Sequence, residues 1–293
     1  MREFIHSTVN RVFSDFEETT AQAGSLCACK GLSYENGNSP DYDNFQVEQL
    51  YMLRFFPAYL AEYYLMYGKM LQSGFLPEQL NVLSIGCGCG VDLCGLKFAI
   101  SHRGGEPDAR IAYQGVDIAN WHYQSNWGLN NAVFVNHDIS QMDSLGNISN
   151  NVLVFPKSIG EFPPEVFENL RQTLENSSFS QDRVVVLCSL MNSGGLNEMS
   201  RLTRVSTALQ SNGFRCLDNT NEYWHTPNCN GLSNICPGFD YPDAVKDQIA
   251  GLKALCPTYN RNGVSCEADC DCLNRWPILT ARYIKYAFLR FER

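Results

Sequence analysis

The chain has 293 residues, enough for one large α/β domain or for a core domain with insertions. Hydrophobic residues make up 44% of it, and the net charge is −9. The sequence has no run of Lys or Arg, no apolar stretch of the roughly 18 residues that a membrane helix needs, and no apolar signal segment at its start. These features argue against a nucleic-acid-binding or membrane-spanning protein and predict a cytoplasmic one.

A helical cap is expected over residues 1–78. Apolar and aromatic residues recur at helical spacing from Phe45 to Leu71, with Gln46–Met70 as the helical part. Pro57 falls inside this segment, which predicts two helices or one kinked helix.

From Asn81 onward, short β-branched runs alternate with helical patterns, which is typical of βαβ units and a parallel sheet. We predict an α/β core over residues 79–224 and 278–293, interrupted by a Cys-rich insert at 225–277. The expected strands are Val82–Ile85, Ile111–Val116, Ala132–Val135, Val152–Phe155, Arg183–Leu187, a short one near Phe214–Asp218, and Arg282–Phe291. The expected helices are Val91–Ile100, Trp121–Leu129, Pro164–Leu174 and Leu196–Ser211.

Three glycines follow the first predicted strand of the core, in the sequence VLSIGCGCGVD. Glycines at such a strand-to-helix turn let the backbone approach a ligand closely, and they mark a nucleotide-type site. Gly86, Gly88 and Gly90 form G-x-G-x-G, which differs from the dinucleotide pattern G-x-G-x-x-G. The motif resembles motif I of the class I S-adenosylmethionine-dependent methyltransferases. The resemblance implies S-adenosylmethionine as cofactor and a Rossmann-like sheet, mostly parallel with an antiparallel last strand.

Two acidic residues extend the resemblance. Asp117 ends the second predicted strand, where the family places the acid that binds the ribose hydroxyls; a carboxylate can accept from both. Asp138 follows the third strand, where the family often contacts the adenine amino group. Many members carry an acid two residues before the first glycine, whereas this chain has Ser84. In the cap, the guanidinium of Arg54 could hold the methionine carboxylate.

The fourth strand leads into FPKSIGE, the place of the family's motif IV beside the transferred methyl group. This stretch lacks the Asp/Asn-Pro-Pro-aromatic sequence of amino-methylating nucleic-acid enzymes. Ser158 and Glu161 are catalytic candidates by location alone; the alternatives are a turn hydroxyl and an acid at the start of a helix. Cys188 is interpreted as a buried structural thiol, because motif IV lacks the Pro-Cys with which RNA cytosine methyltransferases pair such a residue.

The chain contains 13 cysteines, and a reducing compartment argues against a disulfide framework. Several lie in polar, loop-rich sequence, where soft thiolates select zinc or an iron–sulfur cluster. We expect a structural zinc site, with an iron–sulfur cluster or unligated thiols as alternatives. The expected ligands are Cys256, Cys266, Cys270 and Cys272 of the insert, completed by Cys27 and Cys29 of the cap. Further candidates are Cys229, Cys236 and His225.

The resemblance implies methyl transfer from S-adenosylmethionine to an unidentified acceptor. The negative net charge favours a small-molecule or peptide acceptor over nucleic acid, and a protein partner remains open. One alternative is a non-catalytic module that keeps the fold and the cofactor and serves a partner, which Ser84 would favour. A second alternative is an RNA-modifying methyltransferase with a metal cluster, which the charge opposes.

Overall fold

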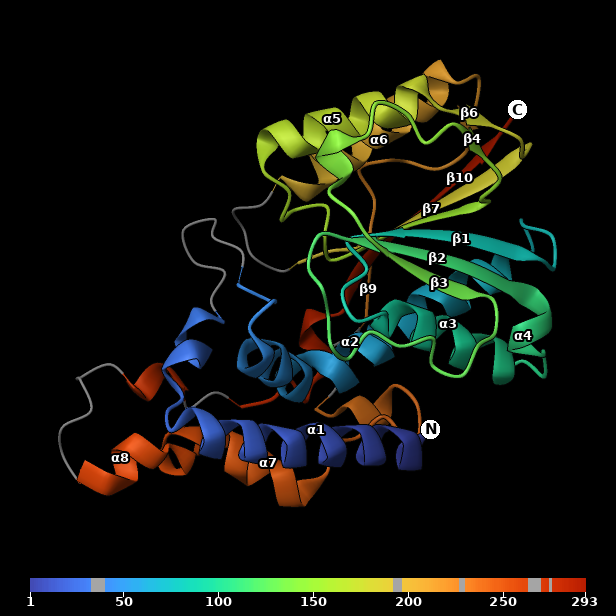
Figure 1. Cartoon of the computed structure of the whole chain (residues 1–293). Coiled ribbons are helices and arrows are strands. Elements are labelled where there is room, and N and C mark those ends of the chain that lie inside the picture. Colours follow the sequence, from blue (N-terminus) through green and yellow to red (C-terminus); the bar gives the residue numbers. More distant parts are fainter. Residues whose placement is uncertain (33–39, 192–196, 227–229, 263–269, 274–275) are drawn as a thin grey trace. The chain divides into compact units, whose positions relative to one another are not determined.

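The computed structural model describes residues 1–32, 40–191, 197–226, 230–262, 270–273 and 276–293 (Figure 1). The chain divides into two compact units. The helical unit comprises Met1–Ala61, Trp121–Tyr123 and Asn228–Ala281, and the sheet unit comprises Glu62–Asn120, Gln124–Pro227 and Arg282–Arg293. Within the described ranges, no helix combines the length and apolar character needed to cross a membrane.

The sheet unit is built on a mixed sheet whose main strands are parallel. Its strands in spatial order are β3 (Ala132–Asn136), β2 (Ile111–Asp117), β1 (Leu80–Ile85), β5 (Val152–Pro156), β7 (Arg183–Ser189), β10 (Lys285–Glu292) and β8 (Arg215–Cys216). Neighbouring strands from β3 to β7 are parallel, whereas β10 is antiparallel to both β7 and β8. This topology confirms the predicted fold class. Two further short strands, β4 (Asn147–Ile148) and β6 (Ser178–Phe179), form a separate parallel pair, and β9 (Trp224–His225) pairs with β10.

Helices cover both faces of this sheet (Figure 1). On one face lie α5 (Pro164–Asn176) and α6 (Glu198–Ser211), and on the other lie α3 (Val91–Ser101) and α4 (Pro107–Arg110). Pro164 suits the first position of α5, because its missing N–H would have no helical partner there. Phe167, Leu170 and Leu174 then recur on one face of α5 and are buried against the sheet.

The helix α2 (Phe45–Ser73) is continuous, with Pro57 inside it, so the single-helix alternative is the one observed. Its residues from Glu62 onward belong to the sheet unit, where they pack against α3. A Cβ atom added to Gly95 of α3 would come within 2.6 Å of Tyr63 Cβ, which shows how closely the two helices approach.

The helical unit holds α1 (Arg2–Ala23) and the first part of α2. α1 lies beside α7 (Asp243–Ala250), and His6 Nε2 lies 2.8 Å from Asp240 Oδ1 (Figure 1). The remaining short helices of this unit are η1 (Cys27–Gly31), η4 (Leu232–Asn234), η5 (Leu252–Leu255), α8 (Pro257–Asn262) and η6 (Cys270–Leu273). The short helix η7 (Ala281–Tyr283) begins at the last residue of this unit and continues into the sheet unit.

The predicted helix at Trp121–Leu129 is wrong. Ser125 and Asn126 accept hydrogen bonds from the main-chain N–H groups of Trp127 and Gly128, at 3.1 and 3.0 Å. These side-chain bonds stabilise turns in competition with a helix. Trp127 also has a φ angle of 50°, which is incompatible with a right-handed helix. The last strand begins at Lys285 rather than Arg282, because Ala281–Tyr283 forms η7. Of the predicted Leu196–Ser211 helix, Leu196 lies outside the described residues, and α6 begins at Glu198.

Candidate cofactor site

The glycine loop connects the carboxyl end of β1 to α3. Gly86, Gly88 and Gly90 have φ angles of 69°, 56° and 79°, all in the left-handed region that favours glycine. The loop is anchored to the neighbouring strand, because the N–H of Gly86 donates to Val116 O at 2.8 Å. Space also requires glycine at position 86: an added Cβ would lie 2.4 Å from Ser158 Cβ. The loop is therefore a fixed cradle of main chain at the edge of the sheet.

Asp117, at the carboxyl end of β2, lies against this loop. Its Oδ2 accepts a hydrogen bond from the N–H of Gly88 at 2.7 Å, and its Oδ1 accepts one from the N–H of Ala119 at 2.9 Å. Gln124 reaches the loop from the other side and donates to Gly88 O at 3.1 Å. The structure thus brings together the glycines and the acid that the sequence singled out.

The other two proposed cofactor ligands are placed differently. Asp138 follows β3 and caps the short helix η3 (Ile139–Gln141), with its Oδ1 accepting from the N–H of Ser140 at 2.9 Å. Hydrogen bonding from the Ser140 side chain, followed by that from its main-chain N–H, lowers the pKa of Asp138, so its carboxylate stays charged. Arg54 belongs to the helical unit, where its guanidinium carbon lies 4.9 Å from the centroid of the Phe55 ring. Its role toward the cofactor stays a prediction.

Ser158 and Glu161 follow β5, at the same edge of the sheet as the glycine loop. The Ser158 hydroxyl donates to Ile85 O at 2.5 Å, and its Cβ faces Gly86. Glu161 is partly buried, and its pKa is raised to about 8. Burial is the main cause, the negative charge of Asp117 adds to it, and Lys157 opposes it. A carboxyl group with this pKa can both bind and release a proton near neutral pH.

A buried ion pair joins Lys157, which directly precedes Ser158, to Glu62 of α2. The ammonium of Lys157 donates to Glu62 Oε1 at 3.0 Å and to Leu190 O at 2.8 Å. Ser189, at the end of β7, donates to the same carboxylate oxygen at 2.5 Å. Burial nevertheless raises the pKa of Glu62. Glu62 falls inside the cap predicted at residues 1–78, and no role was predicted for it or for Lys157. A lysine directly after a fully apolar strand was the available signal.

A second buried acid, Asp92, was missed entirely. It lies in the first turn of α3 and accepts hydrogen bonds from the hydroxyls of Tyr113 and Tyr67, at 2.9 and 3.2 Å. Ser84 is buried beside it. Burial raises the pKa of Asp92 to about 6, although these hydroxyls stabilise its charged form. The structure therefore places a carboxyl group next to Ser84, beneath the glycine loop.

The cysteines of the core are packed thiols. Cys87 and Cys188 are buried, and burial raises the pKa of both well above its usual value. A thiol with a raised pKa stays protonated and is a poor nucleophile. For Cys188, burial and a protonated thiol agree with its interpretation as a structural residue.

The peripheral cysteines converge only in part. In the helical unit, η6 contacts both η1 and η5, and Cys29, Cys256 and Cys270 on or beside these elements are buried. Burial, with smaller contributions from Cys256 and Cys27, raises the pKa of Cys29 to about 12. No three potential ligands with described side chains are positioned to hold a metal ion. Cys266, Cys229 and the side chain of Cys272 lie outside the described part, and zinc stays a prediction. Of the further candidates, Cys236 is buried in the helical unit, and His225 is exposed on β9 of the sheet unit.

Comparisons with known proteins find likeness in structure but not in sequence. No protein-family model matches the chain, and no curated protein matches it. The plantazolicin methyltransferase BpumL, solved with S-adenosylhomocysteine, is 15% identical; the match covers 95% of this chain and 99% of BpumL, with a TM-score of 0.41. The YcgJ protein from Bacillus subtilis is also 15% identical, over 78% of this chain and 97% of YcgJ, with a TM-score of 0.40.

A third similar structure is the magnesium protoporphyrin IX methyltransferase ChlM from Synechocystis, solved with bound S-adenosylmethionine. It is 16% identical, over 63% of this chain and 78% of ChlM, with a TM-score of 0.32. At these low identities and TM-scores, the fold assignment depends on the features of this chain itself. Its strand order, its antiparallel last strand and its glycine loop give it a Rossmann-like, class I methyltransferase-like fold.

Proposed function

We propose that the protein transfers methyl groups from S-adenosylmethionine. The observation that supports this most directly is the 2.7 Å hydrogen bond from the N–H of Gly88 to Asp117 Oδ2. It joins a loop whose glycines have left-handed backbone angles to an acid at the end of the adjacent strand. This arrangement is suited to a nucleoside ligand. S-adenosylmethionine would supply an activated methyl group; the chain would supply its binding and orientation.

Each candidate residue has a role in this proposal. The main chain of Gly86, Gly88 and Gly90 would approach the cofactor closely, and Asp117 would accept hydrogen bonds from its ribose hydroxyls. Asp138 would contact the adenine amino group. Arg54 would hold the methionine carboxylate, with bidentate geometry as its advantage over a lysine.

On the acceptor side, Glu161 is the proposed proton acceptor. Its pKa of about 8 leaves it largely protonated at neutral pH and charged in mild alkali. Ser158 is a positioning residue in this scheme, because its hydroxyl is bonded to Ile85 O and its Cβ supports the glycine loop.

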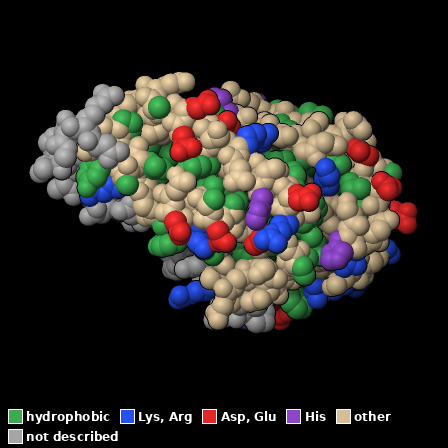
Figure 2. All heavy atoms as spheres, turned by 90° about the horizontal axis from the view of Figure 1, so that it is seen from below, with side chains coloured by type: hydrophobic (Ala, Val, Ile, Leu, Met, Phe, Trp, Pro, Cys, Tyr) green, Lys and Arg blue, Asp and Glu red, His purple; other side chains and the backbone are tan. Residues whose placement is uncertain are grey.

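We propose a small-molecule or peptide acceptor. The net charge is −9, and on the face drawn in Figure 2 acidic and basic side chains are intermingled. A nucleic-acid-binding face typically gathers Lys and Arg into one patch. The proposed zinc would have a structural role in the helical unit.

Calorimetry with S-adenosylhomocysteine tests cofactor binding. Replacing Asp117→Asn keeps the shape of the side chain but removes its charge, and should weaken binding by about 1.5–3 kcal/mol. Asp108→Asn is the matched control, since this exposed acid also accepts a main-chain hydrogen bond, from Asn130 at 2.8 Å. Absence of binding by the wild-type protein would refute the proposal.

Turnover is tested separately, by mass-spectrometric detection of S-adenosylhomocysteine after incubation with S-adenosylmethionine and fractionated cell extract. Formation of product that depends on both protein and extract supports catalysis. Tight cofactor binding without product in any fraction would favour the non-catalytic alternative.

A further inference from the structure

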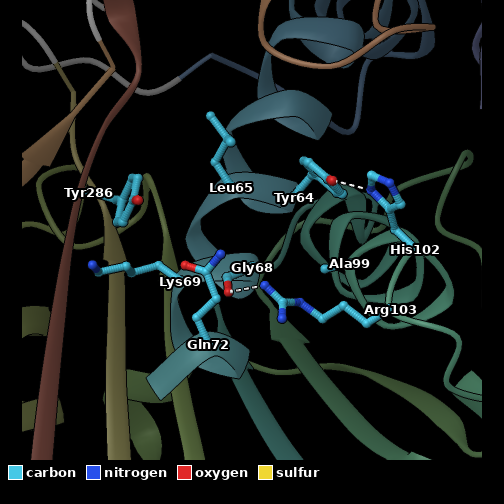
Figure 3. A pocket seen from close by; sticks show the side chains of 9 residues that line it. All are labelled: Tyr64, Leu65, Gly68, Lys69, Gln72, Ala99, His102, Arg103 and Tyr286. Atoms are coloured by element: carbon cyan, nitrogen blue, oxygen red, sulfur yellow. Dashed lines mark hydrogen bonds between the residues drawn. The ribbon is translucent and has the colours of Figure 1, made fainter. Parts of the chain in front are cut away.

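A cavity of about 440 Å³ lies in the sheet unit between α2, the C-terminal end of α3 and β10 (Figure 3). This volume is within the range of about 300–1,000 Å³ that is common for small-molecule sites. Tyr286 and Ala99 are buried in its wall, whereas Gln72, His102 and Arg103 are exposed. The cavity thus has buried residues in its inner wall and exposed polar residues at its rim.

The lining of this cavity is basic. It includes Lys69 and Arg103, and none of the described residues that line it is an Asp or a Glu. This contrasts with the whole chain, in which acidic residues outnumber Lys and Arg by 31 to 22. The local excess of positive charge favours an anionic ligand.

The two cations of the cavity contact neutral partners. Arg103 Nη2 donates to Gly68 O at 3.2 Å, and Lys69 Nζ lies 3.9 Å from the centroid of the Trp224 ring. Among the described residues, neither side chain forms an ion pair. Neither cation is therefore neutralised by an ion pair within the described residues, although Lys69 also lines an adjoining pocket with Asp218 and Glu222.

Other lining side chains can complete a polar site. The hydroxyl of Tyr64 is hydrogen-bonded to His102 Nδ1, which holds both side chains at the cavity (Figure 3). Gln72 can donate from its amide and Tyr286 from its hydroxyl. Several donors in one cavity match the several acceptor oxygens of a phosphate group better than the two of a carboxylate.

The cavity is separate from the glycine loop. α3 begins directly after Gly90, and His102 and Arg103 follow its last residue. Eleven residues of α-helix span about 16 Å, so the loop and the rim of the cavity lie at opposite ends of α3.

We propose that this cavity binds the phosphate group of a small phosphorylated molecule. The guanidinium of Arg103 and the ammonium of Lys69 would attract the negative charge of the phosphate, and hydrogen bonds from Gln72 and Tyr286 would orient it. The volume leaves room for an organic part beside the phosphate. S-adenosylmethionine carries no phosphate, so the ligand is distinct from the proposed cofactor.

The test is calorimetry on the full chain with glycerol 3-phosphate and with inorganic phosphate, in saturating S-adenosylhomocysteine. Arg103→Gln and Lys69→Gln should each raise the dissociation constant for glycerol 3-phosphate about tenfold, as expected for loss of a charge-assisted hydrogen bond. The matched control is Arg110→Gln, because Arg110 is half-buried and likewise donates to a main-chain carbonyl, Glu78 O at 3.1 Å, outside the cavity. Circular dichroism confirms that all three variants are folded.

Three results would overturn the inference: no binding of either phosphate at millimolar concentration, equal weakening by Arg110→Gln, or binding of inorganic phosphate as tight as that of glycerol 3-phosphate. Asp117→Asn should leave phosphate binding unchanged, and Arg103→Gln should leave S-adenosylhomocysteine binding unchanged. These cross-controls separate failure of this inference from failure of the proposed methyl transfer.

Discussion

Lys157 Nζ lies 3.0 Å from Glu62 Oε1, in a buried ion pair that joins the end of β5 to α2. The backbone of Lys157 has a φ angle of 61°, in the left-handed region that non-glycine residues rarely adopt. A strained residue of this kind persists when its surroundings fix it. Here the fixing contacts come from Glu62 and Leu190, and they hold the main chain that leads into Ser158.

Replacing Lys157 should show how much the Glu62–Lys157 ion pair contributes to the stability of the protein. Lys157→Met leaves the Glu62 carboxylate buried without a counter-charge, and we expect the free energy of unfolding to fall by about 3–5 kcal/mol. Urea denaturation measures the loss. The double variant Glu62→Gln with Lys157→Met removes both charges and should recover part of the stability. A single variant as stable as the wild type would show that Glu62 is already neutral in the folded protein.

Two glycine-to-alanine variants separate the cost of backbone strain at a left-handed residue from the cost of a steric clash with a neighbouring side chain. Gly86→Ala and Gly104→Ala both place a Cβ on a left-handed residue, with φ angles of 69° and 76°, and each should cost about 1–2 kcal/mol for that reason. Only at Gly86 does the new Cβ meet an obstacle, Ser158 Cβ at 2.4 Å; at Gly104 nothing lies within 4 Å. Gly86→Ala should therefore lose about a further 1–3 kcal/mol. Equal losses in urea denaturation would contradict the close packing of Gly86 on Ser158.

Asp92 makes a pH-dependent contribution to stability. Its pKa is raised from 3.8 to about 6, so between these values the folded protein binds more protons than the unfolded one. Its contribution is fully present below about pH 4 and falls by about 3 kcal/mol as the pH rises to 6. Asp92→Asn should remove this part of the dependence. The measurement is the difference in unfolding free energy between wild type and variant from pH 4 to 7; a constant difference would rule out the shift.

Glu161 can be followed directly by its carboxyl signal in ¹³C-detected nuclear magnetic resonance. One glutamate should titrate near pH 8, and Glu161→Gln should remove that signal. Since the charge of Asp117 contributes to the raised pKa, Asp117→Asn should move the titration to lower pH. If every glutamate titrates below about pH 6, Glu161 is charged at neutral pH and its proposed role changes.

The cysteine prediction concerns metal content. We expect elemental analysis of freshly prepared, reduced protein to find about one zinc per chain, and Cys256→Ser to lower that content. Cys94→Ser is the control, because Cys94 is buried in α3 of the sheet unit, whereas Cys256 belongs to the helical unit. Chelation should destabilise the helical unit before the sheet unit. Protein free of zinc and iron would contradict both expected metals.

Much of the fold could be predicted because the sheet strands are short apolar runs with clear limits. β5 is fully buried along its length, and Val152–Phe155 stands out in the sequence for that reason. A helix was wrongly predicted at Trp121–Leu129 because the spacing of its apolar residues is similar to that of a helix. The side-chain bonds of Ser125 and Asn126 decide its conformation instead, and these are visible only in three dimensions.

In the candidate site, the glycine loop and Asp117 could be predicted from the sequence, whereas the buried charged residues could not. The glycines directly follow one predicted parallel strand and Asp117 ends the next, so a local sequence pattern places them at neighbouring strand ends. The structure brings them together. The Glu62–Lys157 pair joins positions far apart in the chain, and the orientation of α2 on the sheet determines it. Asp92 resembles an ordinary acid in a first helical turn, and its burial beneath two tyrosines depends on the packing of β2 and α2.

The contact between Gly86 and Ser158 has a consequence for how such sequences diverge. No side chain fits at position 86 while Ser158 occupies its present place, so the residue tolerated at position 86 depends on the residue at position 158. Among homologous sequences, we expect position 86 to remain glycine wherever position 158 carries a Cβ atom and the loop keeps its path. In an alignment, a residue other than glycine after β1 should therefore occur only together with glycine at position 158 or with a loop of different length.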